Sequence, residues 1–430
     1  MIFNSVIQFL ESRSIMPKEM PGIEKLKKAF QKTTWFSSID SKKVIVVAGT
    51  NGKGSTCAIL ESLLFSAGKK VGFYSSPHLI DTTERIRINK VPISQEHFIQ
   101  LFLNNERLIV DFELTHFESL TLMCADYFFS NTWSNKIDYA IFEVGLGGIF
   151  DATNAIPHDF SVITKLALDH TQILGPDLAS IAKNKFGIVQ RNNRVIHHIL
   201  PDEVLELKKI IMQQTESDWI QAVPYTYQLT SEQNSILKTK WGEASLNLLG
   251  DRAAENAATA LTIFSELGFK PEMHLSALQQ IVWNGRMQKV DWPGIKAPLF
   301  LSGDHNLQGI QSLAEILTHF SFDNLFMIVG IGKDKDVLKM VTELLKIPKS
   351  LLYLTETSFK GFKVNEYPPE VLKLSHSWNA DFKVLMQEIS VYAKARDLVL
   401  VTGSLYLVGS VLQEIKNQLV SEIGPNKQAT

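Results

Sequence analysis

The sequence predicts an α/β protein in which a P-loop domain, built on a doubly wound and mostly parallel sheet, precedes a smaller Rossmann-like α/β domain. Short apolar runs alternate with helical patterns along most of the 430 residues, which is the pattern of α/β folds. The runs are apolar throughout rather than alternating, as expected for parallel strands that helices cover on both faces. Near Asp291 a stretch with Gly, Pro and Trp interrupts the periodicity. We therefore expect two domains, 1–290 and 291–430.

The individual elements follow from the apolar runs and from helical spacing. The expected strands of the first domain are Val44–Ala48, Val71–Ser75, Ala140–Val144, Phe160–Leu166 and Val195–His198. Those of the second domain are Pro298–Ser302, Leu325–Gly330, Leu351–Leu354 and Leu398–Gly403. The helical patterns include an amphipathic N-terminal segment, Ser55–Ala67, Phe117–Phe129 and a stretch that begins at Asp251. Between Tyr225 and Leu249 polar and apolar residues alternate, which predicts a small antiparallel sheet.

The composition describes a soluble globular protein and excludes several other classes. Hydrophobic residues make up 45% of the chain and charged residues 20%, which is typical of globular domains. The formal net charge of −2 gives no basic field for nucleic acid. Cys57 and Cys124 belong to no CxxC pair or His/Cys cluster, so we expect neither a zinc site nor a disulfide framework. The N-terminus lacks the basic region of a signal peptide, and no apolar run reaches membrane-spanning length. We expect a cytoplasmic protein with no membrane partner.

The stretch "VIVVAGTNGKGSTCAILESLL", residues 44–64, has the pattern of a phosphate-binding loop between a strand and a helix. The loop residues are Gly49, Thr50, Asn51, Gly52, Lys53, Gly54 and Ser55. The glycines let the backbone turn tightly and aim its N–H groups at phosphate oxygens, and a helix expected to begin at Ser55 adds its positive end. Lys53 can reach the β and γ phosphates. The alternative is a tight turn with a solvated lysine, which the combination of strand, glycines, lysine and helix disfavours.

Gly54 stands where the usual loop has a Ser or Thr whose hydroxyl holds Mg²⁺, so another residue must hold the metal. Glu143 lies near the carboxyl end of an apolar strand, and ligands bind at the carboxyl ends of strands in a doubly wound sheet. It is a candidate Mg²⁺ ligand, although a carboxylate at a strand end often simply faces solvent. His170 follows another strand toward the same edge, but a lone histidine is more often structural. Lys185 has partly apolar neighbours, and composition alone favours a surface lysine.

The second half of the chain has polar clusters after its expected strands. Arg286 lies in "NGRMQ", Asp304 and His305 lie in "SGDHNLQG", and "GKDKD" follows a further strand. We expect these clusters to face the first domain across a cleft. Each cluster alone is an ordinary loop.

Together the motifs resemble those of the bifunctional dihydrofolate synthase/folylpolyglutamate synthase family, a relative of the Mur peptide ligases. The matching pieces occur in family order: "GTNGKGS", "YSSPHLIDTTERIRIN", "FESLTL", "EVGLGGIFDATN", "LALDHTQILG", "AKNKFGI", "NGRMQ" and "GKDKD". They span roughly residues 44–336, and a weaker match, "TGSLYLVG", lies at 402–409. Within the Mur superfamily, "GTNGKGS" combined with "SSPHL" and "ERIRI" points to the folate branch.

The resemblance implies how the metal is held. It assigns the missing hydroxyl to Ser76, which would serve a first Mg²⁺ ion together with Glu143. His170 would serve a second ion. Lys185 matches a lysine that is carbamylated in the family, and the CO₂ adduct would turn a repelled ammonium into an anionic oxygen ligand. The resemblance therefore implies catalytic roles for Lys53, His170 and Lys185.

The resemblance also implies the substrates. Two groups of residues would hold them: Phe117, Asp151 and Asn154 for the pterin, and Asn256, Arg286 and His305 for ATP. The implied reaction is ATP-dependent addition of L-glutamate to dihydropteroate, to the γ-carboxylate of (tetrahydro)folates, or to both. It passes through an acyl phosphate and gives ADP and phosphate. The partners would be these small molecules alone, and the protein would act as a monomer.

Some positions depart from the family pattern. The pair Ile149 and Phe150 stands where many members have Arg-Leu. The segment "SGDHNL" replaces "DGAHNP", so the acid before the glycine is lost and Asp304 appears two residues later. The segment "GDRA" at 250–253 replaces "G-x-H-Q". We therefore expect the Mg–phosphate centre to follow the family more closely than the folate and nucleotide contacts do.

Two other functions fit parts of the pattern. A Mur-type ligase that joins amino acids to a UDP-N-acetylmuramoyl acceptor usually carries an extra N-terminal domain, and about 40 residues before the loop strand are too few for one. A non-catalytic nucleotide-binding protein would reuse the loop without needing Glu143, His170 and Lys185. It would bind ATP with no glutamate-dependent release of ADP.

Overall fold

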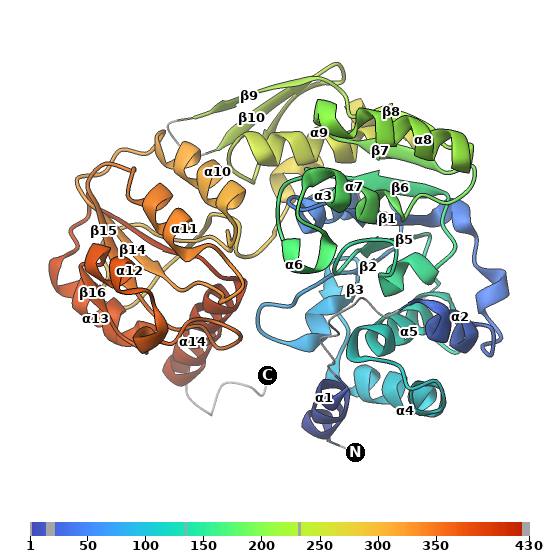
Figure 1. Cartoon of the computed structure of the whole chain (residues 1–430), viewed down its shortest axis with the longest axis horizontal. Coiled ribbons are helices and arrows are strands. Elements are labelled where there is room, and N and C mark those ends of the chain that lie inside the picture. Colours follow the sequence, from blue (N-terminus) through green and yellow to red (C-terminus); the bar gives the residue numbers. More distant parts are fainter. Residues whose placement is uncertain (1, 14–21, 134–135, 231–233, 424–430) are drawn as a thin grey trace. The chain divides into compact units, whose positions relative to one another are not determined.

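The computed structural model describes residues 2–13, 22–133, 136–230 and 234–423 (Figure 1). The chain forms two compact units. The first consists of Met1–Thr226, Leu237–Ser245 and Ala253–Ile281, and the second of Tyr227–Ile236, Leu246–Arg252 and Val282–Thr430. The chain therefore passes between the units several times before residue 282.

The first unit is built on an eight-stranded sheet with the order β4-β3-β2-β5-β1-β6-β7-β8. Its strands are β1 (Val44–Ala48), β2 (Val71–Tyr74), β3 (Ile86–Ile88), β4 (Val91–Pro92), β5 (Tyr139–Glu143), β6 (Phe160–Ile163), β7 (Arg194–His197) and β8 (Asp218–Gln221). Neighbours pair in parallel, except β2 with β3 and β3 with β4. This mostly parallel sheet confirms the predicted fold class. β6 ends at Ile163 rather than at Leu166, because Lys165 forms an antiparallel bridge with Asn51.

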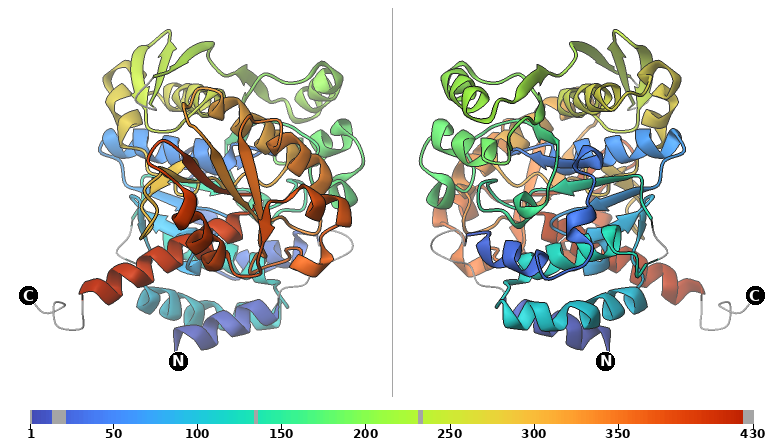
Figure 2. Two further views of the ribbon diagram at one scale, coloured as in Figure 1. Left: turned by 90° about the vertical axis from the view of Figure 1, so that its left-hand side faces the viewer. Right: turned by 90° about the vertical axis from the view of Figure 1, so that its right-hand side faces the viewer.

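Helices cover both faces of this sheet (Figures 1 and 2). They are α1 (Phe3–Ser12), α2 (Glu24–Phe30), α3 (Lys53–Ser66), α4 (Gln95–Asp111), α5 (His116–Phe129), α6 (Thr171–Leu174), α7 (Leu178–Phe186) and α8 (Leu205–Thr215). α3 is buried from Gly54 to Leu64, as expected for a helix that is apolar on most of its circumference. It begins at Lys53, two residues before the predicted start. α5 begins with a capping box between Thr115 and Glu118, which satisfies first-turn N–H groups.

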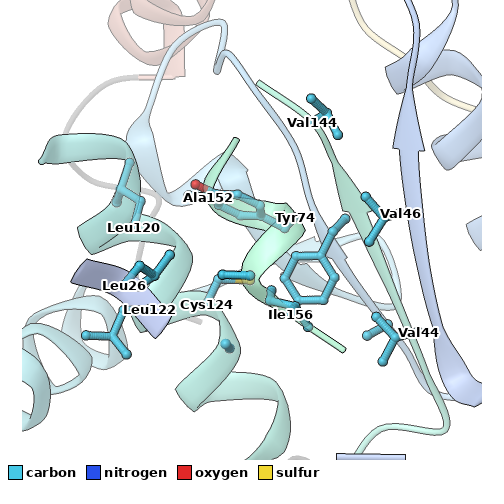
Figure 3. Close-up of a cluster of buried hydrophobic side chains, with 14 of the residues drawn as sticks. Leu26, Val44, Val46, Tyr74, Leu120, Leu122, Cys124, Val144, Ala152 and Ile156 are labelled. Atoms are coloured by element: carbon cyan, nitrogen blue, oxygen red, sulfur yellow. The ribbon is translucent and has the colours of Figure 1, made fainter. Parts of the chain in front are cut away.

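The core of the first unit fixes β1 from one face of the sheet. Alternate residues of a strand point to the same face, and Val44 and Val46 pack there in one buried cluster with α2, α5 and the 3-10 helix η4 (Ala152–Ala155). Figure 3 shows this cluster with its labelled members Leu26, Val44, Val46, Tyr74, Leu120, Leu122, Cys124, Val144, Ala152 and Ile156. Because every residue of β1 is buried, the loop that follows it starts from a rigid strand end.

The second unit has a six-stranded sheet with the order β12-β13-β17-β14-β15-β16. Its strands are β12 (Gln288–Val290), β13 (Leu299–Leu301), β14 (Leu325–Val329), β15 (Ser350–Leu354), β16 (Ser377–Trp378) and β17 (Leu398–Thr402). Only the pairing of β12 with β13 is antiparallel among the described strands of this sheet. Its helices are α10 (Leu307–Leu317), α11 (Val337–Leu344), α12 (Pro369–Leu374), α13 (Phe382–Tyr392) and α14 (Leu405–Ile423). The predicted second α/β sheet is confirmed.

A three-stranded sheet and a long helix occupy the stretch where the chain changes units. The strands are β9 (Tyr225–Leu229), β10 (Ser235–Thr239) and β11 (Gly242–Leu246), in the order β11-β10-β9. The helix is α9 (Asp251–Glu266), whose first two residues belong to the second unit and the rest to the first. Within the described part of the chain, none of the helices combines the length and the apolar character needed to cross a membrane.

Candidate functional site

The loop between β1 and α3 has the shape of an anion cradle. Gly52 has φ +91° and caps α3, and a Cβ on it would collide with the side chain of Asn256. Both facts require glycine there. Thr50 N and Asn51 N donate to the Lys165 carbonyl at 2.8 and 3.3 Å, so these two amides fix the loop. The first-turn amides of α3 have no intrahelical acceptors and lie at the positive helix end, which suits a phosphate.

Two lysines meet at one carbonyl of this loop. Lys53 Nζ donates to Gly49 O at 3.1 Å and to Thr50 O at 3.3 Å, and Lys185 Nζ, from α7, donates to Gly49 O at 2.8 Å. Lys185 is 4% exposed. Burial and then the charge of Lys53 lower the pKa of Lys185 to about 7. Near neutral pH a large fraction of Lys185 is therefore an uncharged, nucleophilic amine.

Glu143 and Ser76 lie at the same edge of the sheet. Glu143 is the last residue of β5 and pairs in register with Val47 of β1, two residues before Gly49. Glu143 is 5% exposed, and its carboxylate accepts a hydrogen bond from Ser76 N at 3.2 Å. Burial raises the pKa of the Cys57 thiol on α3, and Glu143 raises it further whereas Lys53 lowers it. Glu143 and Lys53 thus both lie within electrostatic reach of the start of α3.

His170 lies on a segment that is hydrogen-bonded to the phosphate-binding loop. Thr50 Oγ1 donates to Ala167 O at 3.0 Å and accepts from Ala167 N at 3.1 Å. Three residues later His170 has φ +49°, a conformation that few residues other than glycine adopt. Its backbone N–H donates to Asp169 Oδ1 at 2.9 Å. The Asp169 carboxylate also acts on Lys185, whose pKa it raises against burial.

The donor set at this edge fits a magnesium ion that is bound together with nucleotide. Among the residues that the structure describes, no group of three or more His, Cys, Asp or Glu side chains could hold a metal by itself. The expected ligands include only two such residues, Glu143 and His170, beside the hydroxyl of Ser76. Mg²⁺ usually takes one or two carboxylates and completes its shell with water and substrate phosphates. A buried carboxylate next to an anion cradle meets that requirement.

Phe117 and Asp151 shape the glycine-rich turn after β5. The Phe117 ring packs on Gly145, where a Cβ would lie 2.6 Å from Cζ. Asp151 Oδ2 accepts from the N–H groups of Gly145 and Leu146, both at 3.0 Å, and Oδ1 accepts from Thr153. Burial raises the pKa of Asp151 although these hydrogen bonds oppose it. The Asp151 carboxylate therefore holds the turn together, a role that the motif alone did not reveal.

Asn154 also bonds within the protein and lines a groove. Its Nδ2 donates to the carbonyls of Ile149 and Gly187 at 3.2 and 3.0 Å. The groove has a volume of about 400 Å³ and is lined by Ile23, Lys27, Gln31, Phe36, Asn154, Ala155, Pro157, Gly187 and Gln190. Asn154 is thus placed on the side of η4 that faces α2.

Asn256 of α9 lies over the phosphate-binding loop. Its Oδ1 accepts from Thr56 Oγ1 of α3 at 3.2 Å, and its side chain occupies the space beside Gly52. The structure therefore brings a residue 200 positions away in sequence against the loop that the motif identified.

In the second unit, Arg286 and His305 both lie next to Gly303. A Cβ on Gly303 would lie 2.8 Å from Arg286 Nη1, and His305 Nδ1 lies 2.9 Å from Gly303 O. The neighbouring Asp304 forms an ion pair with Arg252, Nη2 to Oδ1, at 2.7 Å. Burial alone would raise the pKa of Asp304, but the guanidinium groups of Arg252 and Arg286 outweigh it and hold the pKa below its ordinary value. Arg252 was not among the expected site residues.

Comparison with known proteins identifies the family. Residues 47–264 match the Mur ligase middle domain. The chain is 31% identical over 387 residues to the dihydrofolate synthase/folylpolyglutamate synthase of Buchnera aphidicola subsp. Baizongia pistaciae, and the match covers 87% of each chain. The chain belongs to the dihydrofolate synthase/folylpolyglutamate synthase family. The predicted resemblance is confirmed.

Solved structures of family members share the whole fold. Escherichia coli FolC in complex with DHPP and ADP superimposes with a TM-score of 0.82 at 26% identity, covering 98% of this chain and 99% of that chain. A bifunctional folylpolyglutamate synthase/dihydrofolate synthase with Mn, AMPPNP and L-glutamate bound gives a TM-score of 0.81 at 27% identity, covering 97% and 98%. The likeness therefore includes both units of the chain and extends beyond the Mur ligase middle domain.

Proposed function

We propose that this chain adds L-glutamate to dihydropteroate, to the γ-carboxylate of (tetrahydro)folates, or to both, and that the same reaction converts ATP to ADP and phosphate. As a family member the chain is an ATP-dependent carboxylate–amine ligase. The observation that carries the proposal is the arrangement of side chains at the carboxyl edge of the first sheet. There Lys53 and Lys185 share the Gly49 carbonyl, and Glu143 bonds to Ser76.

The reaction needs a better leaving group than hydroxide. In the first step a carboxylate oxygen of the acceptor attacks the γ-phosphorus of ATP, the bond to the β–γ bridging oxygen breaks, and ADP leaves. In the second step the amine of glutamate attacks the acyl-phosphate carbonyl, loses a proton, and displaces phosphate. Positioning and neutralisation of charge on the transferring phosphoryl group are the main tasks of such a site.

The residues at the edge divide these tasks. The amides at the start of α3 and the Lys53 ammonium hold the β and γ phosphates. Ser76 and Glu143 would hold a first Mg²⁺, and His170 with Lys185 would hold a second. The metal, when bound, neutralises phosphate charge without any proton transfer. The Mn²⁺ and AMPPNP in the solved family member support a divalent ion and ATP for this chain.

We further propose that Lys185 is carbamylated. A charged ammonium beside Mg²⁺ would be repelled, whereas carbamate oxygens suit the ion. CO₂ reacts with a neutral amine, and burial together with Lys53 lowers the pKa of Lys185 to about 7. The Gly49 carbonyl at 2.8 Å holds the amine at the loop, where the carbamate oxygens are needed.

The contacts in the structure support the remaining assignments to different degrees. Asn256 lies against the phosphate-binding loop and would contact ATP. Arg286 and His305 converge at Gly303 and would also contact it. Phe117 lines the turn after β5 and would pack against the pterin, whereas Asp151 and Asn154 would act by shaping that turn. The domain assignment to 1–290 and 291–430, the cytoplasmic location and the monomeric state stay predictions.

An assay of ADP release with three acceptors tests the proposal. The full-length protein is incubated with MgATP and L-glutamate, and with dihydropteroate, tetrahydrofolate or a UDP-N-acetylmuramoyl acceptor. We expect release that requires glutamate and one of the two pterin acceptors. Release with the muramoyl acceptor alone would contradict the proposal in favour of a cell-wall ligase. ATP binding without glutamate-dependent release would indicate a nucleotide-binding protein that is not an enzyme.

A further inference from the structure

A buried carboxylate on α9 lies close to a lysine and a histidine side chain at the ends of neighbouring strands. Glu255 Oε1 lies 3.5 Å from Lys165 Nζ, which follows β6. Glu255 Oε2 lies 3.3 Å from Nδ1 of His198, which follows β7. The His198 ring is 1% exposed, and within the described residues neither of its nitrogens makes a hydrogen bond of good geometry. The Glu255 carboxylate is thus the charged group that lies close to both Lys165 and His198.

This network touches the phosphate-binding loop from two sides. The Lys165 carbonyl accepts the N–H groups of Thr50 and Asn51. The residue after Glu255 is Asn256, which fills the space beside Gly52 and bonds to Thr56 at 3.2 Å. The Glu255 carboxylate therefore links Lys165, whose carbonyl holds the loop amides, to α9, whose Asn256 side chain covers Gly52.

We propose that Glu255 is a positioning residue for nucleotide binding, which holds Lys165 and Asn256 in the places that preform the phosphate-binding loop. A loop that is already in its bound conformation loses less freedom on binding, and affinity rises accordingly. The inference rests on the proposed function, because it takes the loop as the ATP site.

The same helix offers a matched control that lies away from the loop. Glu266, at the last turn of α9, forms an ion pair with Arg194 at 3.0 Å. Glu266→Gln makes the same chemical change on the same helix, and its partner Arg194 begins β7 at the end of the sheet opposite to the loop. If Glu255 only stabilised the fold as any ion pair on α9 does, the two substitutions would act alike on nucleotide binding.

The test measures the binding of AMPPNP with Mg²⁺ to full-length wild type, Glu255→Gln and Glu266→Gln by calorimetry. We expect Glu255→Gln to bind about tenfold more weakly, which is about 1.4 kcal/mol, and Glu266→Gln to bind like the wild type. In turnover, the KM for ATP of Glu255→Gln should rise while the KM for L-glutamate stays unchanged. Lys165→Met, which removes the partly exposed cation, should weaken AMPPNP binding about threefold. This variant replaces Glu255→Gln in the test if Glu255→Gln does not fold.

Three results separate the possible failures. The inference is overturned if Glu255→Gln binds AMPPNP with wild-type affinity. The same holds for Lys165→Met where that variant replaces Glu255→Gln. Equal weakening in Glu255→Gln and Glu266→Gln also overturns it, because the effect then belongs to the helix. A wild-type protein that binds no AMPPNP would count against the proposed function itself.

Discussion

The carboxyl edges of the two sheets carry charge in different ways. At the first edge the side-chain nitrogens of Lys53 and Lys185 both donate to the backbone carbonyl of Gly49. At the second edge the guanidinium of Arg252 is paired directly with Asp304, which also accepts from Ser302. At the first edge Lys53 bonds to the neutral carbonyls of Gly49 and Thr50, which leaves its positive charge available for a polyanion. At the second edge Asp304 neutralises Arg252, so this ion pair stabilises loops of the protein itself.

This difference separates the two edges by function. Substitution of Lys53 at the first edge should impair catalysis and leave stability nearly unchanged. Substitutions at the second edge should lower stability, since they leave a buried charge without its partner. Substitutions at both edges, in order of decreasing expected effect, test that division.

Lys53→Ala should lower the rate of product formation about 10³-fold or more with every acceptor, because it removes a donor to the transferring phosphoryl group. Steady-state ADP release with dihydropteroate and with tetrahydrofolate measures this. The free energy of unfolding should change by about 0.5 kcal/mol or less. Lys69→Ala, just beyond the other end of α3, is the matched control and should turn over normally. Normal turnover in Lys53→Ala would rule out its assigned role.

Asp304→Asn should lower the free energy of unfolding by about 3 kcal/mol at neutral pH, because Arg252 then lies beside Arg286 without a carboxylate. The two guanidinium groups hold the Asp304 pKa below its ordinary value. The wild type should therefore lose this contribution as pH falls through the lowered pKa, and the variant should have none to lose. Urea unfolding at several pH values measures both. The exposed pair Lys333–Glu366 gives the control, because Glu366→Gln should leave the free energy of unfolding nearly unchanged.

The pH dependence of stability should reveal Lys185. Its pKa in the folded protein is about 7, and its ordinary value is 10.5, so between these values the unfolded state binds more protons. The free energy of unfolding of the metal-free, CO₂-free protein should therefore rise with pH from about 7 to 10. Lys185→Met should flatten this rise, whereas the exposed neighbour Lys183→Met should keep it. An unchanged slope in Lys185→Met would show that the lysine is ordinarily charged in the fold.

Ser302→Ala should have the smallest effect, a loss of about 1.5 kcal/mol in the free energy of unfolding, because it removes a hydroxyl that donates to a charged carboxylate. The same measurement in an Asp304→Asn background should give a smaller loss, since the acceptor is then neutral. A double-mutant cycle on these two residues measures the coupling. Strict additivity would mean that the hydroxyl does not serve Asp304.

The sequence contained enough information for the fold and for the phosphate-binding loop, because both follow from local patterns. Buried parallel strands are continuous apolar runs, and β1 matches its predicted bounds from Val44 to Ala48. The strand–glycine–helix pattern likewise identified the cradle around Lys53. α3 begins at Lys53 rather than at the predicted Ser55, because Gly52 caps the helix. Differences of this size are usual at helix ends.

The parts that the sequence did not reveal depend on contacts between distant segments. Nothing local indicates that Arg252 meets Asp304, or that Glu255 meets His198 and Lys165, because folding alone brings these residues together. Asp151 is a further example. The motif predicted a substrate contact, but the structure shows its carboxylate bonded to the amides of Gly145 and Leu146. Conversely, Ser76 and Glu143 were predicted from family motifs and lie in hydrogen-bond contact.

The most direct test of the account follows the oxygen atoms of the acceptor. Dihydropteroate labelled with ¹⁸O in its carboxylate is incubated with ATP, Mg²⁺, L-glutamate and the wild-type protein, and the released phosphate is examined by mass spectrometry. If the carboxylate is phosphorylated at the loop of Lys53, one ¹⁸O atom of each reacting acceptor should appear in inorganic phosphate, and Lys53→Ala should give none. Phosphate free of ¹⁸O, released as the amide product accumulates, would contradict the account.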